Sequence, residues 1–271
     1  MRKNRERAAP SIRKIWRTFF LVVLLVMGLV LAAVSWLVDR ALRMEAAQNS
    51  LMILEGYMEQ LDQQLTAAES QLFPLAVSLA EREEADVRDE AGIYMAQRAL
   101  SASMEAVLLV NPVAEGMWYS RPASETVPFL ASCPNLRDYS EMVQIRTSVV
   151  RLNQGNIPSG WFLYPMGDGQ YLVRMACYGG LSLGMWIRAD TILSTLEGYS
   201  GELGSDLFLG DQDGRILERN RDGAMDKMEV VSAETPTKIL HVGGRTYIQA
   251  AVQSGPGRFL LVSVLPLKNM L

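Results

Sequence analysis

The sequence is poor in the side chains that metal centres and nucleophilic sites use most. It has one histidine, His241, and two cysteines, Cys133 and Cys177, among 271 residues. Structural zinc sites need four such ligands, usually at close spacing. The sequence also lacks a glycine-rich phosphate-binding loop, the commonest nucleotide signature. We therefore expect no metal ion and no cofactor.

The two cysteines leave two interpretations open. In an oxidising compartment Cys133 and Cys177 could form one disulfide, and a cross-link that closes a loop of about 44 residues stabilises a protein by a few kcal/mol. The alternative is that both are small, unpaired residues of the core.

Only one long apolar run is present. Residues 19–38 (FFLVVLLVMGLVLAAVSWLV) carry no charge, and about 20 apolar residues cross the ~30 Å hydrocarbon core of a bilayer as a helix. The preceding tail, residues 1–18, carries seven basic side chains and one acid. Because basic flanks stay in the cytoplasm, we expect a single-pass cell-membrane protein whose body is extracytoplasmic. A cleaved signal peptide is the alternative, although its apolar part usually has only about 7–15 residues.

Basic charge is scarce after the tail. Residues 19–271 hold 19 basic and 29 acidic side chains, a net charge of −10. Nucleic-acid-binding domains carry basic patches, so this segment predicts no nucleic-acid partner.

Apolar residues recur at alternating steps of four and three beyond the apolar run, which is typical of a long helix with a narrow seam. We expect one helix at 39–72, an interruption at Pro74 and a second helical piece at 75–84. The seam is either a homodimer interface or the strip on which later parts of the chain pack. As a dimer seam it would consist of Leu51, Leu54, Met58, Leu61, Leu65 and Leu72.

The remaining periodicity predicts an α+β chain. Helices are expected at 91–104, 139–152 and 189–199, and strands at 105–111, 116–121, 160–165, 170–178, 181–188, 207–210, 215–218, 238–242, 246–253 and 259–264, with glycine-rich hairpin turns between several of them. The predicted division is a helical stalk with a second helix at 39–104, one unit at 105–188 and a smaller unit at 189–271.

Two short motifs are candidates for a catalytic or a metal-binding site. Ser182 lies in a G-x-S-x-G sequence, the nucleophile elbow of α/β-hydrolases, and His241 follows it. That elbow needs a parallel strand, a sharp turn and a helix, whereas residues 181–186 continue as an apolar strand, so a surface serine hydrolase is only a third hypothesis. The sequence Asp211-Gln212-Asp213-Gly214 is too short for a calcium loop and predicts a hairpin turn.

Aromatic and basic residues gather on the strands of the first unit. An arginine among aromatics on a concave sheet is a plausible anion clamp for a small ligand, with the alternative that the aromatics are core and the arginine is exposed or paired. The candidate ligand-binding residues are Trp118, Tyr119, Arg121, Trp161, Tyr164, Arg174 and Tyr178.

The order of these features resembles the double-Cache (PAS-like) extracytoplasmic sensor domains of bacteria, as in Firmicute sensor histidine kinases and membrane-anchored AraC-type regulators. The resemblance covers about residues 39–271. It rests on residues 159–178 (SGWFLYP…GQYLVRMACY), 182–196 (SLGMWIRADTILSTL), 211–217 (DQDGRIL) and 258–267 (RFLLVSVLPL). It implies two PAS-like antiparallel-sheet units, the first membrane-distal with the ligand pocket and the second membrane-proximal. The family's amino-acid-binding motif is not matched beyond Trp118-Tyr119, so the ligand class stays open.

We therefore expect a non-enzymatic sensor domain of a signal-transduction receptor, which binds a small solute and relays a helix shift to the membrane within a homodimer. The chain is expected to be truncated, because residues 265–268 (LPLK) read like an approach to another helix. The alternative is a membrane-anchored structural or interaction protein that uses its long heptad helix.

Overall fold

The computed structural model describes residues 12–81, 90–122, 124, 129–134, 139–155, 157–203, 205–219 and 235–267. The chain divides into two compact units, Met1–Gln48 and Asn49–Leu271. Helix α1 (Ile12–Glu81) begins in the first unit and ends in the second.

The first unit holds the one helical segment, within the described residues, that is long and apolar enough to cross a membrane. Its apolar side chains are exposed along the whole run, for example Leu21 at 66% and Leu25 at 65%. Soluble proteins rarely expose a continuous apolar surface of this size. The segment therefore fits a membrane anchor.

Helix α1 continues through Pro74, so the predicted break there is wrong. A proline inside a helix removes one backbone hydrogen bond and crowds the preceding turn. On both sides of it, however, Leu72, Ala76 and Leu79 are buried against the rest of the second unit. Tertiary packing of this stripe outweighs the local cost, as it commonly does for helices in folded proteins.

Helix α2 spans Glu90–Val110, and the strand predicted at 105–111 is also wrong. The buried residues of α2, Leu100, Met104 and Leu108, are spaced four residues apart, so its apolar face keeps the helical period to the end of the helix. Asn111 then ends the helix, because its Nδ2 donates to the Val107 carbonyl (2.8 Å) and to Gln71 Oε1 of α1 (2.9 Å).

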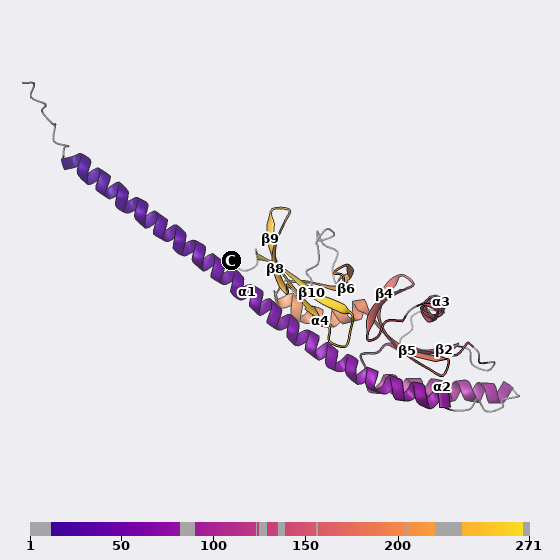
Figure 1. The fold of residues 1–271 in the computed structure, drawn as a ribbon. Coiled ribbons are helices and arrows are strands. Elements are labelled where there is room, and N and C mark those ends of the chain that lie inside the picture. Colours follow the sequence, from indigo (N-terminus) through magenta and orange to yellow (C-terminus); the bar gives the residue numbers. More distant parts are fainter. Residues whose placement is uncertain are drawn as a thin grey trace, which may run out of the picture. The chain divides into compact units, whose positions relative to one another are not determined.

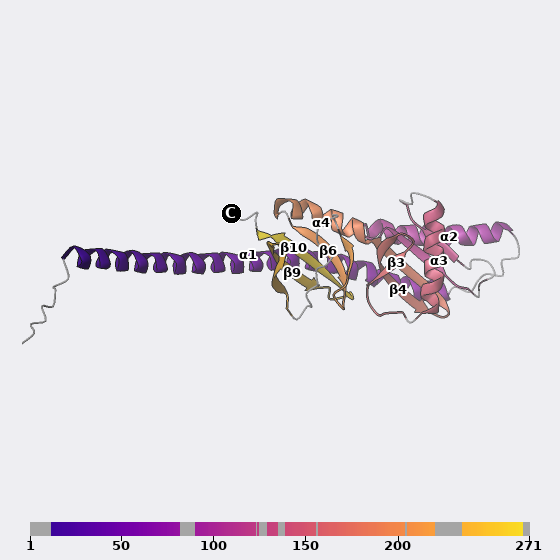
Figure 2. The ribbon, with the colours of Figure 1, turned by 90° about the horizontal axis from the view of Figure 1, so that it is seen from above.

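The first sheet is antiparallel and has the strand order β2-β1-β5-β4-β3. Its elements are β1 (Gly116–Ser120), β2 (Phe129–Ser132), β3 (Phe162–Met166), β4 (Gly169–Tyr178) and β5 (Leu181–Arg188), with α3 (Tyr139–Gln154) between β2 and β3. In Figures 1 and 2, α3 covers one side of this sheet, while α1 and α2 lie on the other. The predicted hairpin turns are present, with positive φ at Gly167, Gly179 and Gly180.

The second sheet repeats the first. Helix α4 (Ala189–Leu203) leads to β6 (Asp206–Asp211), β7 (Ile216–Arg219), β8 (Thr237–Val242), β9 (Arg245–Gln253) and β10 (Phe259–Pro266). Its order is β7-β6-β10-β9-β8, the same pattern of first to fifth strand as in the first sheet. The predicted turn at Asp211 is also present, since Asp211 Oδ1 accepts from the Arg215 backbone N–H at 2.8 Å. The fold is therefore α+β with two PAS-like antiparallel-sheet units.

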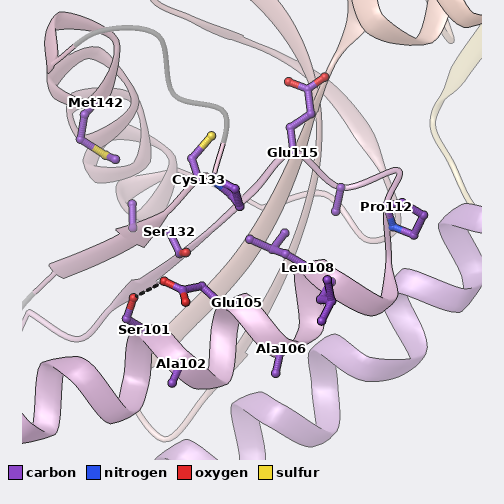
Figure 3. Close-up of a pocket in the computed structure, with 14 residues that line it drawn as sticks. Ser101, Ala102, Glu105, Ala106, Leu108, Pro112, Glu115, Ser132, Cys133 and Met142 are labelled. Atoms are coloured by element: carbon purple, nitrogen blue, oxygen red, sulfur yellow. Dashed lines mark hydrogen bonds between the residues drawn. The ribbon is translucent and has the colours of Figure 1, made fainter.

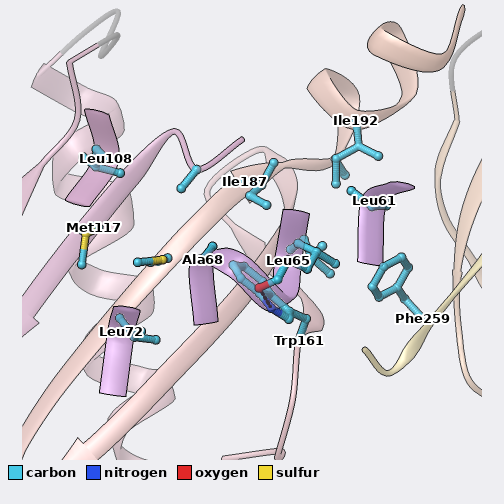
Figure 4. Packing of buried hydrophobic residues seen from close by; sticks show 14 of the residues in the cluster. Leu61, Leu65, Ala68, Leu72, Leu108, Met117, Trp161, Ile187, Ile192 and Phe259 are labelled. Carbon is cyan, nitrogen blue, oxygen red and sulfur yellow. Dashed lines mark hydrogen bonds between the residues drawn. The ribbon is translucent and has the colours of Figure 1, made fainter. Parts of the chain in front are cut away.

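The heptad stripe of α1 packs inside the chain. Leu54, Met58, Leu61, Leu65 and Leu72 are all buried in one cluster with residues of both sheets, and Leu51 packs at its margin. Figure 4 shows Leu61, Leu65 and Leu72 facing this cluster. Of the two interpretations of the stripe, intrachain packing is therefore correct, and the dimer seam through these six residues is wrong. A homodimer stays a prediction that needs another surface.

Trp161 connects α1, the first sheet and the second sheet. Its indole Nε1 donates to the Leu65 carbonyl of α1 at 3.2 Å, and its backbone N–H donates to the Pro256 carbonyl at 3.1 Å. The Arg258 N–H in turn donates to the Trp161 carbonyl at 2.6 Å. The side chain is completely buried, so the predicted ligand contact of Trp161 is replaced by a structural one.

Replacing Leu65 with Asp tests this assignment of the stripe. Leu65 is 0% exposed, so Leu65→Asp buries an unpaired charge and should cost about 4 kcal/mol or more of unfolding free energy. Met52, on the same helix but 66% exposed, supplies the control, and Met52→Asp should change it by less than about 0.5 kcal/mol. Urea unfolding followed by circular dichroism measures both. A Leu65→Asp protein of wild-type stability that only loses oligomeric mass would restore the dimer seam.

Candidate functional site

The two faces of the first sheet pack against different helices. Along β1, Met117 and Tyr119 belong to the cluster shared with α1 and α2, whereas Trp118 belongs to the cluster under α3. This alternation follows from the two-residue period of a strand. The face under α3, which we call the α3 face, is the one not packed on the long helix.

Two stacked tryptophans form the centre of the α3 face. The rings of Trp118 and Trp186 lie with centroids 6.0 Å apart and planes 22° from parallel. The Trp118 indole lies over Gly184, and the Trp186 indole lies over Gly116. A Cβ atom at either glycine would clash with the indole above it. The two glycines thus provide the room in which the indoles lie flat on the sheet.

A charged cluster lies at one end of this face. Tyr171 and Arg188 are cross-strand partners on β4 and β5. The Tyr171 hydroxyl donates to Glu141 Oε1 of α3 at 3.2 Å, and Arg188 pairs with Asp190 at 2.8 Å and with Glu141 at 3.7 Å. Burial, followed by the negative charge of Glu141, raises the pKa of Tyr171 to about 12.

A second polar group lies six residues away along β5. Ser120 Oγ accepts from Asn153 Nδ2 at 3.2 Å, and the Ser120 carbonyl accepts from Ser182 Oγ at 3.4 Å. Two buried atoms here lack a hydrogen-bond partner within the described residues, namely Trp118 Nε1 and Asn153 Oδ1. Such atoms are costly unless something pairs with them, so the α3 face offers both a donor and an acceptor.

A cleft of about 1020 Å³ borders the α3 face at its β2 edge. Helix α2, the end of β2 and Met142 of α3 form its walls, and Figure 3 shows Glu105, Cys133 and Met142 around it. The charged residues that line it are two acids, Glu105 and Glu115. Ser101 Oγ donates to Glu105 Oε1 at 3.0 Å. The cleft therefore favours a positively charged group.

Glu115 is the more buried of these two acids. Desolvation by burial raises the pKa of its carboxyl above the usual value, while a hydrogen bond from Thr191 and the charge of Arg188 oppose the shift. Its Oε1 is buried and has no hydrogen-bond partner among the described residues. In Figure 3 its carboxyl group points away from Glu105.

The structure brings together only part of the predicted ligand set. Trp118 and Tyr164 lie on the α3 face, and Arg121 is half-buried just after β1. Tyr119 packs in the core on the opposite face, and Tyr178 stacks edge-on against Phe73 of α1.

Arg174 also faces α1, so the anion-clamp interpretation is wrong for it. Its guanidinium forms a 2.6 Å ion pair with Glu69 and donates to the Met175 carbonyl. The alternative considered from the sequence, a paired arginine, is correct.

Sequence reasoning missed the charged cluster and the cleft acids. The register of β1, β5 and β4 places Tyr171 and Arg188 on the same face as Trp118. The sequence of a single strand does not determine that register. The sequence predicts a strand at Glu105, and Glu141 belongs to a helix from a different segment of the chain, so neither acid is among the predicted site residues. A helical period through 100, 104 and 108 was the available signal for Glu105.

Neither of the two cysteines forms a disulfide in the structure. Cys133 follows β2 and Cys177 is on β4, and β1 and β5 lie between these strands. Strands are about 4.8 Å apart, so the two residues are separated by roughly 14 Å, while a disulfide needs Cα atoms within about 7 Å. The disulfide that the sequence allowed is therefore not formed.

The hydrolase hypothesis also fails on geometry. Ser182 lies inside strand β5 of the first sheet, paired with Ser120 and Cys177, without the turn and helix of a nucleophile elbow. His241 lies on β8 of the second sheet, where its Nδ1 contacts Thr246 Oγ1 at 3.0 Å. Among the described residues, no three His, Cys, Asp or Glu side chains are grouped to hold a metal ion.

Comparison with known proteins supports the fold. No protein-family model and no curated protein sequence matches the chain. Among solved structures, it is similar to the ligand-binding domain of the Pseudomonas aeruginosa amino acid chemoreceptor PctC in complex with GABA, at 13% identity over 81% of this chain and 99% of that one, with a TM-score of 0.51.

Two further solved structures have the same fold. The sensory domain of the Campylobacter jejuni chemoreceptor Tlp3 matches at 12% identity over 84% of this chain and 96% of that one (TM-score 0.50). The extracellular domain of the predicted histidine kinase rpHK1S-Z16 matches at 10% over 84% and 97% (TM-score 0.54). The chain thus has a double-Cache-like sensory fold, and these neighbours are sensory or extracellular domains rather than catalytic ones.

Gly184→Ala tests the close packing of the Trp118 ring on Gly184. A methyl group there would displace the Trp118 ring, and overpacking of this kind costs about 1–3 kcal/mol of unfolding free energy. Gly56→Ala, in α1 with nothing within 4 Å of the new methyl, should instead stabilise by about 0.5–1 kcal/mol. Denaturant unfolding with tryptophan fluorescence measures both effects, and an unperturbed Gly184→Ala protein would contradict the close approach.

The raised pKa of Tyr171 predicts a loss of stability in alkali. An unfolded tyrosine ionises near pH 10, whereas the folded one keeps its proton to about pH 12. Between these values the native state binds more protons, so unfolding free energy falls as pH rises. The urea midpoint of the wild type should therefore decrease more from pH 10 to 12 than that of Tyr171→Phe. Parallel curves for the two proteins would show that Tyr171 is not the group responsible.

Proposed function

We propose that this chain is the extracytoplasmic sensor part of a bacterial membrane receptor and that it binds a small solute carrying an amino group in the membrane-distal sheet unit, residues 105–188. The observation that carries this proposal is the cleft beside the α3 face, whose charged lining consists of Glu105 and Glu115. Two acids without a cation in the same lining attract an ammonium group and repel an anion.

The fold neighbours support a receptor role. The PctC domain is that of an amino acid chemoreceptor and holds GABA, which carries one ammonium group. Trp118 Nε1 and Asn153 Oδ1, which lack partners among the described residues, lie on the α3 face but do not line the cleft. From the acidic lining of the cleft, amino acids and short amines are the ligand class we propose.

The orientation follows from the charges around the anchor. Seven basic residues precede the apolar run, and positive flanks stay inside. The N-terminus would then be cytoplasmic, and the two sheet units would lie outside.

Signal relay would use α1, because both sheet units are bound to it by polar contacts as well as by the stripe. Arg174 of the first sheet pairs with Glu69 at 2.6 Å. The loop before β10 contacts Asp62, whose carboxylate accepts from Ser254 Oγ at 2.7 Å and from the Gly255 N–H at 2.8 Å. A ligand that prefers one arrangement of the first sheet would thus bias the position of α1, within a homodimer formed through surfaces other than the stripe.

A binding screen of the full chain in lipid nanodiscs tests the ligand class. Amino acids, GABA, short amines, organic acids and sugars would be compared by thermal shift and then by calorimetry. We expect an amine-bearing compound to raise the melting temperature, since binding to the native state alone stabilises it. Glu105→Gln should weaken that compound about 10- to 100-fold, the usual effect of losing a charged hydrogen bond.

Glu90→Gln is the matched control, because Glu90 is an exposed acid of the same helix that does not line the cleft. Its affinity should equal that of the wild type. Binding restricted to carboxylates or sugars, or equal affinities of Glu105→Gln and wild type, would reject the proposed site.

A further inference from the structure

A second cavity, which shares only Pro112 and Glu115 with the lining of the cleft, lies between α1 and α4. It measures about 320 Å³, at the lower end of the range for small-molecule sites. Its floor is apolar and buried, made by Leu61 of α1, Ile187 of β5, and Ile192 and Leu196 of α4. We call it the α1–α4 groove.

The rim of the α1–α4 groove is polar but uncharged. Gln60 and Gln64 of α1 face Thr191 and Thr195 of α4 across it, and all four side chains are exposed. Such a rim lets a ligand enter from water without removing any charged side chain from solvent.

One charged residue lines the groove, and that residue is Glu115. Its buried Oε1 has no hydrogen-bond partner among the described residues, so an acceptor is available at the end of an apolar trough. Glu115 also lines the cleft, but its carboxyl points away from Glu105 in Figure 3. An apolar floor with one buried, unpartnered carboxyl oxygen is complementary to a short hydrocarbon with a single donor head.

We propose that the α1–α4 groove is a second ligand site, specific for a small amine with an apolar chain or ring, whose ammonium group reaches Glu115 while its hydrocarbon lies on Leu61, Ile192 and Leu196. Water alone would satisfy the carboxyl oxygen but would leave the apolar floor exposed. An anion would meet the only charge of the lining with the wrong sign. This site does not depend on the proposed function of the cleft.

Occupancy of the groove would bridge the two helices that lead from one sheet unit to the next. Its walls are α1, which contacts both sheets, and α4, which connects β5 to β6. A bound amine would add contacts to both helices at once and would so favour the arrangement in which they are close. The groove could therefore act as a second input to the same receptor.

Two matched substitutions on α4 separate this site from the rest of the protein. Thr195 lines the groove, whereas Ser194 is its exposed neighbour and does not. Both hydroxyls donate to the same acceptor, the Thr191 carbonyl, at 2.8 and 3.0 Å. Thr195→Trp should fill the groove, and Ser194→Trp should leave it open at the same loss of a hydrogen bond. Gln64→Trp fills it from α1 should the first variant fold poorly.

The test is calorimetry of the full chain in nanodiscs with n-pentylamine, pentan-1-ol and pentanoate as probes. We expect saturable binding of the amine, weaker binding of the alcohol and none of pentanoate. Thr195→Trp or Gln64→Trp should weaken the amine at least tenfold, while Ser194→Trp stays within twofold of the wild type. Partition into the lipid is the same for all variants and therefore cancels in the comparison.

Glu105→Gln distinguishes the groove from the cleft, because Glu105 lines only the cleft. Amine binding that survives Thr195→Trp and Gln64→Trp but is lost in Glu105→Gln would overturn the groove and leave the proposed function standing. Absence of any saturable pentylamine binding would also overturn the groove. Binding that is lost in Thr195→Trp and kept in Glu105→Gln would support the groove whatever the cleft does.

Discussion

Packing of both sheets on one apolar stripe of α1 is the constraint on which the rest of the second unit depends. A single sheet cannot bury its own apolar face without a second layer, and the stripe from Leu54 to Leu79 is part of that layer. Trp161, which precedes β3 of the first sheet, donates to the Leu65 carbonyl of α1 and to the Pro256 carbonyl in the loop before β10 of the second sheet. A displacement of α1 would therefore affect both sheets, as the proposed relay requires.

This constraint also decides where a ligand could bind on the first sheet. Its α1-facing side is filled by core side chains and by the Arg174–Glu69 pair. On the other side, among the described residues, α3 covers the sheet, and Trp118 Nε1 and Asn153 Oδ1 lack hydrogen-bond partners there. The solute site proposed for the first sheet is therefore placed beside the α3 face, because the side chains of the opposite face pack against α1 and α2.

Much of the fold was predictable because its signals are local. The apolar run, the α1 periodicity and the glycine turns at Gly179 and Gly243 each follow from a few adjacent residues, and the overall order resembled double-Cache domains. The strand predicted at 105–111 failed because β-type residues there keep helical spacing, and Pro74 failed to end α1 because burial outweighs its local cost. The site was less predictable. Whether Arg174 or Arg188 lies on the α3 face depends on strand parity and on partners over 40 residues away in the sequence.

The sign of the expected ligand charge shows why counting charges is not enough. The sequence offers arginines on the strands, which favoured an anion. In the structure Arg174 is neutralised by Glu69, and Arg188 by Asp190 and Glu141, whereas Glu105 and Glu115 form no salt bridge with any described residue and both line cavities. A charge that is already paired contributes little attraction to a ligand, because its field is cancelled close by. These two acids, which lack a salt bridge, are therefore the reason why the proposed site favours a cationic head group.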